Sequence, residues 1–180
     1  MSANQPPWPR EWLMTDERIG KRLWEAIDAL PSGAGIVFRH YATPDGARVA
    51  LAWDIARHCR ERGLTLAVAR DVDLARQLGA QLVHNPSGEP DDLPFSRSAH
   101  SFEEARAACD SGAALLFVSP VFPTSSHPGR RALGQDEAIR IAEVCPMPAI
   151  ALGGVNRANF EPLRRGGFYG WAGIDAWLEG

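Results

Sequence analysis

Residues 148–159 read P-A-I-A-L-G-G-V-N-R-A-N and carry the clearest local signal in the chain. The apolar run Ala149–Leu152 has the length of a buried strand and ends at Gly153 and Gly154. Helical spacing follows over residues 156–165, so the pattern predicts a strand, a tight turn and a helix start. Glycines let a ligand approach the backbone, and the first amides of a helix attract anions. The stretch therefore predicts a phosphate site; a plain strand-to-helix turn is the alternative.

The totals describe an ordinary globular chain. It has 180 residues, 45% hydrophobic content and a net charge of -3, which suit one domain and argue against a nucleic-acid partner. No apolar run is long enough to cross a membrane, and residues 1–10 lack the apolar core of a signal peptide. The three cysteines are far apart in sequence, which argues against a disulfide framework and favours a cytoplasmic location.

Strand-like and helix-like segments alternate along the chain. Strands are predicted at residues 12–14, 35–38, 64–69, 81–83, 95–98, 115–118, 149–152 and 168–172. Helices are predicted at residues 18–30, 45–62, 73–78, 101–111, 136–144 and 156–165, with a terminal turn at 174–178. We expect the 45–62 helix to be capped by Asp45 and to bury Val49, Trp53, Ile55 and Ala56.

Alternation of this kind favours a parallel sheet, either an open doubly wound sheet or a closed (β/α)8 TIM barrel. Eight repeats favour the barrel, although the chain is shorter than the ~200 residues usual for that fold. Reduced third and eighth helices, and a loop in place of the fourth helix at residues 86–94, reconcile the length with a compact barrel. We expect a loose arm at residues 1–10 and a single barrel domain at 11–180.

A polar residue or a glycine lies at or just past the carboxyl end of most of the predicted strands. These residues are Asp16, Arg39, Asp71, His84, Ser98, Ser119 and Gly153. The carboxyl ends of barrel strands meet on one face, where barrel enzymes hold their active sites. The sequence therefore predicts a composite site there, although strands that simply end in polar residues would leave a similar pattern.

Several motifs resemble those of one family, the thiamine phosphate synthases and the TenI-like thiazole tautomerases. The matching stretches are W-L-M-T-D at 12–16, R-D-V-D-L-A at 70–75, A-Q-L-V-H at 80–84, S-A-H-S-F-E-E at 98–104, S-P-V-F-P-T-S-S-H-P at 119–128 and A-L-G-G-V-N-R-A-N at 151–159. They occur in the family's order across nearly the whole chain. The resemblance implies a (β/α)8 barrel and the chemistry of thiamine assembly, in which a pyrimidine pyrophosphate is joined to a thiazole phosphate.

The resemblance also implies roles for individual residues. Gly153 and Gly154 match the turn that holds the thiazole phosphate. Asp71 matches a magnesium ligand, so Mg²⁺ is the implied cofactor, and Arg39 matches a pyrophosphate contact. The second magnesium carboxylate is left open among Glu89, Asp91 and Asp92. His100 matches a histidine implicated in proton transfer in the tautomerases. The remaining implied phosphate contacts are Ser119, Thr124, Arg130 and Arg131.

The chain departs from the family pattern around the pyrophosphate. Tyr41 and His127 stand where the family has lysines, and Lys21, the only lysine, lies too early to replace them. Arg70 replaces the family asparagine beside Asp71, and we expect its guanidinium to compete with a metal for that carboxylate. Alternatively, Arg70, Arg130 and Arg131 supply the missing charge.

These departures leave several functions open. The chain is a synthase with a degenerate pyrophosphate and magnesium site, a TenI-like tautomerase, or a non-catalytic binder of thiamine phosphate. A different phosphosugar barrel enzyme is disfavoured by the P-V-F-P-T stretch at 120–124. In each of the first three readings the partners are small phosphorylated thiazole or pyrimidine compounds, and a homodimer is left open.

Overall fold

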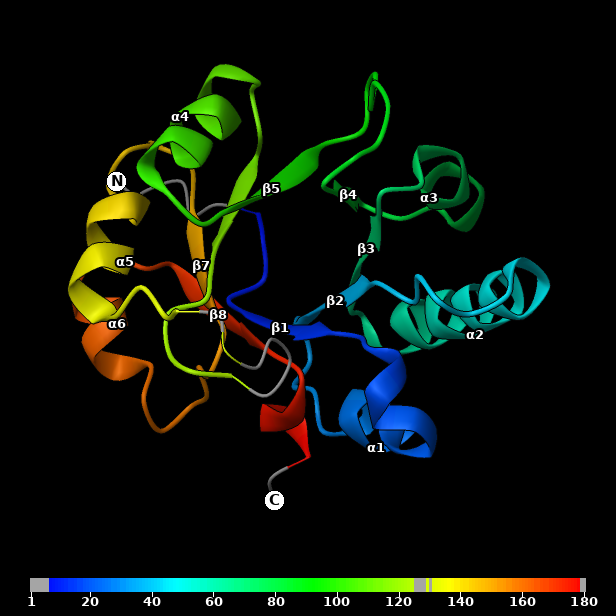
Figure 1. Cartoon of the computed structure of the whole chain (residues 1–180). Helices are drawn as coiled ribbons and strands as arrows, with labels where there is room; N and C mark the ends of the chain where they lie inside the picture. The colour runs from blue at the N-terminus through cyan, green and yellow to red at the C-terminus, as the bar shows by residue number, and fades with distance from the viewer. Residues whose placement is uncertain (1–6, 125–128, 130, 179–180) are drawn as a thin grey trace, which may run out of the picture.

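Eight parallel strands form a closed barrel in the computed structural model, which describes residues 7–124, 129 and 131–178 (Figure 1). Each strand pairs with the next along the chain, and β1 pairs with β8 to close the ring. The strands are β1 (Glu11–Met14), β2 (Gly35–Phe38), β3 (Thr65–Ala69), β4 (Leu82–His84), β5 (Phe95–Ala99), β6 (Leu115–Val118), β7 (Ala149–Leu152) and β8 (Gly170–Gly173). The predicted (β/α)8 barrel is confirmed.

The helices surround the barrel, with α1 to α3 on one side and α4 to α6 on the other (Figure 1). They are η1 (Glu17–Arg22), α1 (Leu23–Asp28), α2 (Asp45–Arg62), α3 (Val72–Leu78), α4 (Phe102–Asp110), α5 (Gln135–Ala142), α6 (Glu161–Arg165) and η2 (Asp175–Trp177). Residues 85–94, all described, contain no helix. A loop therefore replaces the fourth helix, and the short α3 and η2 confirm the expected reductions.

Most strands are buried because both faces of a parallel barrel are covered, and their sequences are accordingly apolar. The exception is β5, which contains Ser96, Arg97 and Ser98. Inside the barrel the Trp12 indole meets the Phe117 ring edge-on, with centroids 5.8 Å apart. Gly35 on the neighbouring strand makes room for this indole, because a Cβ there would lie 2.3 Å from a Trp12 ring carbon. A glycine at the start of β2 thus allows a large ring to fill a small barrel.

Helix α2 has the predicted bounds, but only Ile55 and Ala56 of the four residues predicted to face inward are buried. Val49 and Trp53, expected to face inward, are 38% and 44% exposed. The buried stripe follows Ala52, Ile55, Ala56 and Cys59, and Trp53 lies one residue, or about 100°, away from it. The expected Asp45 cap is also wrong: the N-cap position is Pro44, which makes no side-chain cap bond.

Two other predicted helices are shorter than expected. The helix predicted at residues 18–30 is divided by Gly20, whose φ of 49° and ψ of -127° are not helical. The helix predicted at 156–165 begins only with α6, because Asn156 Oδ1 accepts hydrogen bonds from the amides of Ala158 and Asn159. Asparagine side chains that bond nearby amides compete with helix formation in this way.

The amino-terminal end of the barrel is covered by the segment that precedes β1. The Tyr169 hydroxyl donates to the Trp8 carbonyl over 2.7 Å, and the Trp171 amide donates to the Arg10 carbonyl over 2.8 Å. The described residues 8–10 of the expected arm are therefore attached to β8 and the loop before it.

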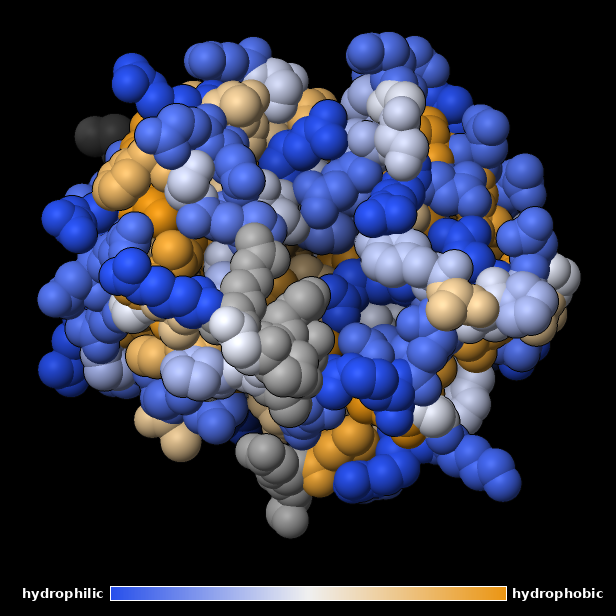
Figure 2. Space-filling model, in the orientation of Figure 1, coloured by the Kyte–Doolittle hydropathy of each residue, from blue (hydrophilic) through white to orange (hydrophobic). Residues whose placement is uncertain are grey.

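In Figure 2 the apolar residues of the visible face form separate patches among polar ones. No described helix is both long enough and apolar enough to span a membrane.

Candidate active site

A cavity of about 440 Å³ opens at the carboxyl ends of the strands. Its walls come from the segments that end or follow β2 to β8. The lining residues on which we rely are Arg39, Tyr41, Arg70, His84, Asn85, Ser98, His100, Ser119, Thr124, Gly153, Gly154, Val155, Asn156 and Asp175. Strand ends from the whole length of the chain thus contribute to one chamber, as expected for a barrel active site.

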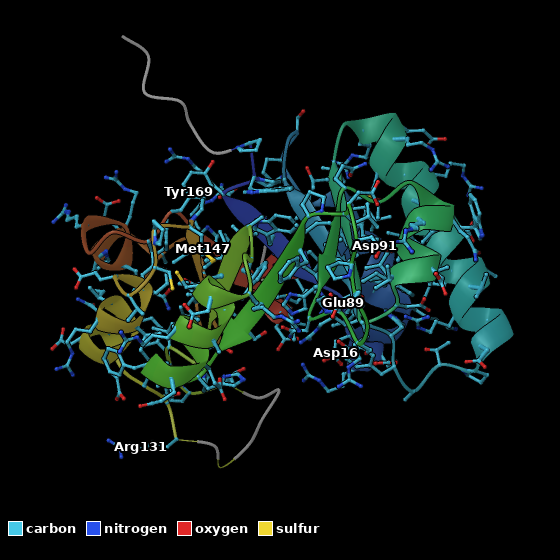
Figure 3. All side chains as sticks on the ribbon, turned by 90° about the horizontal axis from the view of Figure 1, so that it is seen from above. Asp16, Glu89, Asp91, Arg131, Met147 and Tyr169 are labelled. Atoms are coloured by element: carbon cyan, nitrogen blue, oxygen red, sulfur yellow. The ribbon has the colours of Figure 1, made fainter. Side chains whose placement is uncertain are left out.

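Most of the predicted site residues meet in this cavity: Arg39, His100, Ser119, Thr124, Gly153 and Gly154. Two others do not line it. Asp71 begins helix α3, and Arg131 is exposed and projects away from the barrel (Figure 3). The remaining residue, Arg130, lies outside the described residues.

The glycine turn is packed tightly against the segment that follows β6. Gly153 and Gly154 have φ values of +91° and +63°, which residues with a side chain rarely adopt. A Cβ at Gly153 would lie 2.8 Å from Pro120, and one at Gly154 would lie 2.6 Å from the Pro123 carbonyl oxygen. Both positions therefore need glycine for packing alone, whatever the turn binds.

The turn residues line the cavity, although their unused amides are not the set that the sequence predicts. The Asn156 amide is already used, since it donates to Asn159 Oδ1 over 2.8 Å. Within the part of the chain that is described, the amides of Gly153, Gly154 and Val155 have no hydrogen-bond acceptor. Successive amides with left-handed φ form a concave anion site without a helix. The candidate phosphate site is this three-amide turn.

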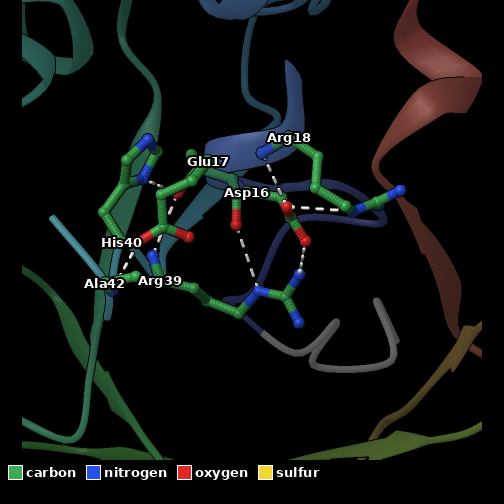
Figure 4. Close-up of polar contacts among 7 residues, drawn as sticks. Asp16, Glu17, Arg18, Arg39, His40 and Ala42 are labelled. Atoms are coloured by element: carbon green, nitrogen blue, oxygen red, sulfur yellow. Dashed lines mark hydrogen bonds and ion pairs between the residues drawn. The ribbon is translucent and has the colours of Figure 1, made fainter. Parts of the chain in front are cut away.

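Arg39 brings a positive charge to the end of β2. Its Nε donates to the Thr15 carbonyl over 3.2 Å, and its guanidinium lies 3.4 Å from Asp16 Oδ2 (Figure 4). Asp16 is shared, because Arg18 also donates to it over 3.0 Å. Burial lowers the pKa of Arg39, yet a guanidinium stays protonated in proteins. Arg39 is thus an anchored cation.

Asp71 is not available as the sequence suggests. Its Oδ1 accepts from the Leu74 amide over 2.9 Å and so caps α3, while its Oδ2 lies 3.0 Å from Arg48 Nη1. The expectation that Arg70 would compete for this carboxylate is therefore wrong, because the competing arginine is Arg48. Arg70 instead stacks on Tyr41, 4.4 Å from the ring centroid.

The donor set does not fit a preformed magnesium site. Magnesium requires near-octahedral oxygen ligation. Both Asp71 oxygens are engaged, and Asp91 is paired with Arg76. The described residues contain no cluster of three or more histidine, cysteine or acidic side chains able to hold a metal.

His100 is oriented by the backbone that follows β6. Its Nδ1 lies 2.5 Å from the Ser119 carbonyl oxygen. A carbonyl only accepts, so Nδ1 carries the proton and Nε2 of the neutral ring carries a lone pair. The amide of His100 is held in turn by Glu104 Oε2 over 2.6 Å. This arrangement suits a group that takes up a proton.

A neutral polar wall continues from β4 to β5. His84 Nδ1 lies 2.9 Å from Ser96 Oγ, and burial lowers the pKa of His84 to about 3, so this ring stays uncharged. Asn85 Nδ2 donates to Ser98 Oγ over 3.0 Å, and the Ser98 amide donates back to Asn85 Oδ1 over 2.8 Å. Asn85 directly follows β4, but no sequence motif indicates a role for it.

Asp175 is the other cavity residue that the sequence analysis missed. It lies just past β8, beside the strand that ends in the glycine turn. The polar residues predicted at strand ends include none after the eighth strand. The same strand-end argument, applied to that strand, predicts Asp175. A negative charge here opposes anion binding in the same cavity.

Comparison with known proteins gives one family. The family model described as "Thiamine monophosphate synthase" matches residues 12–177. A thiamine-phosphate synthase of Geobacillus kaustophilus is 36% identical over 138 residues, which are 71% of this chain and 62%, less than two thirds, of that protein. A putative thiamine-phosphate synthase 2 of Aquifex aeolicus is 29% identical over 95% of this chain and 98% of its own. The solved thiamine phosphate pyrophosphorylase of Pyrococcus furiosus superposes with a TM-score of 0.81 at 26% identity, covering 95% of this chain and 87% of that chain.

Proposed function

Because the chain belongs to the thiamine monophosphate synthase family, we propose that it joins a pyrimidine pyrophosphate to a thiazole phosphate and so forms thiamine phosphate. One observation carries the proposal: a single cavity combines the three-amide turn with the guanidinium of Arg39. Its volume of about 440 Å³ falls within the usual range for small-molecule sites. The two features suit the two phosphorylated substrates of this reaction.

The bond changes define what the cavity must do. The thiazole nitrogen forms a bond to the pyrimidine methylene carbon, and the bond from that carbon to the pyrophosphate oxygen breaks with its electron pair. Negative charge therefore develops on the leaving group, and fixed cations stabilise it most effectively. In this proposal the three-amide turn holds the thiazole phosphate, while Arg39 lies at the pyrophosphate end.

We expect the reaction to be slow. The family resemblance implies magnesium and two lysines around the leaving pyrophosphate, and this chain has neither lysine. The Asp71 carboxylate is occupied by Arg48 and by the α3 cap, so its donor atoms do not fit a ready metal site. The charge that assists departure must come from arginines, with fewer fixed cations than the family pattern supplies.

A second candidate function is favoured by His100. A thiazole tautomerase moves a proton within one substrate, and His100 presents an Nε2 lone pair beside the same cavity. This activity requires no pyrophosphate site, so it tolerates the substitutions at Tyr41 and Arg70. The two candidates differ in whether the pyrimidine substrate is consumed.

Complementation tests the proposal in cells. Expression in a bacterial strain that lacks its own thiamine phosphate synthase should restore growth without thiamine, and the Arg39→Gln variant should restore it poorly. Failure of the wild-type chain to support growth, with folded protein present at normal level, would count against synthase activity.

A cytoplasmic location is part of the proposal and agrees with the three free cysteines. A homodimer remains a prediction.

A further inference from the structure

Among the described cations that line the cavity, Arg70 is the one without an acidic partner. Arg39 also lines the cavity, but it is bound to Thr15 and Asp16. In the described part of the chain, Arg70 makes no ion pair and its side chain makes no hydrogen bond. Its charge is therefore free to meet an anion.

The backbone directs this side chain. Arg70 has a φ of +67°, a conformation that costs free energy for any residue other than glycine. Two hydrogen bonds hold it there: its amide donates to the His84 carbonyl over 2.9 Å, and its carbonyl accepts from the Ser87 amide over 3.0 Å. The end of β3 is thus tied to β4 and to the loop that follows.

Tyr41 supplies a platform for the guanidinium, whose Cζ lies 4.4 Å from the ring centroid. Stacking on an aromatic ring uses the flat face of a guanidinium and leaves its N–H edge available to phosphate oxygens. Burial raises the pKa of the Tyr41 hydroxyl, so the ring remains neutral. Tyr41 stands where the family has a lysine. It therefore orients the guanidinium of Arg70, while the positive charge of that lysine is lost.

We infer that Arg70, stacked on Tyr41, binds the pyrophosphate group of the substrate, and that this binding needs no magnesium. The inference rests on the proposed function and names the residue that carries its leaving-group charge. Its basis is the match between an oriented guanidinium without an ion-pair partner among the described residues and a group with several negative charges, together with the pairing of Asp71 with Arg48. Arg131, the other described arginine considered for this role, is exposed and does not line the cavity.

Calorimetric titration with inorganic pyrophosphate tests the inference directly, with EDTA in one series and Mg²⁺ in the other. We expect the wild-type protein to bind pyrophosphate equally in both. Arg70→Asn should weaken binding tenfold or more, since it removes a charge-assisted contact, and Arg70→Lys should retain part of the affinity. Asparagine tolerates left-handed φ, so the first variant should unfold at no lower a temperature than the wild type. Arg106→Asn, at an exposed position on α4, is the matched control and should bind as the wild type does.

Two results would overturn the inference: unchanged affinity in Arg70→Asn, or wild-type binding seen only with Mg²⁺. Assaying thiamine phosphate formation by the same proteins separates this inference from the proposed function. Synthesis that survives Arg70→Asn undiminished would reject the role of Arg70 and keep the function. Pyrophosphate binding that depends on Arg70, without any synthesis by the wild type, would uphold the binding role and reject the function.

Discussion

The guanidinium of Arg48 lies 3.0 Å from Oδ2 of Asp71, so that a cation from α2 is paired with the carboxylate at the end of β3. Arg48 is held in place by a second bond, since its Nε donates to the His40 carbonyl over 2.9 Å. Only 13% of its side chain is exposed. The pairing therefore blocks an oxygen that a metal would need.

Removing Arg48 should make metal binding easier. We expect the wild-type chain alone to bind divalent cations weakly, because one Asp71 oxygen is paired with Arg48 and the other caps α3. Arg48→Gln should free the first oxygen and raise the affinity for Mn²⁺, which reports on the magnesium position in an electron paramagnetic resonance titration. Arg57→Gln, at an exposed position on the same helix, is the control. Equal Mn²⁺ affinity in wild type and Arg48→Gln would contradict this reading of Asp71.

Stability should fall in mild acid because of His84. Burial lowers its pKa from 6.5 to about 3 in the folded chain, so the unfolded state binds the extra proton between these values. The contribution of His84 to the free energy of unfolding is therefore fully present above pH 6.5 and is lost as the pH falls toward 3. The loss between pH 7 and pH 5 is about 2 kcal/mol. Urea unfolding of His84→Gln should show a smaller loss over that interval; an identical loss would show that His84 does not cause it.

Asp175 should weaken phosphate binding in the cavity. A carboxylate near a bound phosphate costs on the order of 1 kcal/mol in a solvated site. Asp175→Asn should therefore tighten thiamine phosphate binding roughly fivefold, as measured by calorimetry. Asp110→Asn, at the exposed end of α4, should have no effect. Weaker binding by Asp175→Asn would mean that this side chain assists the ligand.

His100 should govern any proton transfer at the site. Its Nδ1 is engaged by the Ser119 carbonyl, which leaves Nε2 to accept a proton. His100→Asn should lower the rate of deuterium uptake from solvent into a thiazole phosphate substrate by roughly 10²–10⁴. A change below a few-fold would return His100 to a structural role.

The fold could be predicted from the sequence because most strands are short apolar runs between polar ends, β5 with its polar Ser96–Ser98 being the exception. Such runs are typical of strands buried on both faces. The failures have local causes. Gly20 interrupts a helical pattern, and the side chains of Asn156 and Asn159 take the amides that a helix would use. Hydrophobic spacing does not register these competing side-chain bonds.

The site could be predicted in part because barrel topology brings strand ends together. That argument predicts the cavity residues Arg39, His84, Ser98, Ser119 and Gly153, whereas His100 is implied by the family resemblance. The fate of Asp71 was not predictable, since its partner Arg48 lies 23 residues earlier on another element. Spacing along a chain gives the neighbours within one helix or strand, whereas contacts between elements depend on packing.

Steady-state formation of thiamine phosphate from the purified pyrimidine pyrophosphate and thiazole phosphate, with Mg²⁺ present, tests the account most directly. We predict product that requires both substrates, at a turnover below about 1 s⁻¹, the lower end of the ordinary enzyme range. The rate should be low because Tyr41 and His127 stand where the family has lysines, which leaves fewer fixed cations around the leaving pyrophosphate. Folded protein that yields no product above the rate without enzyme would contradict the proposed function, and a turnover well above 1 s⁻¹ would contradict the claim that the site is impaired.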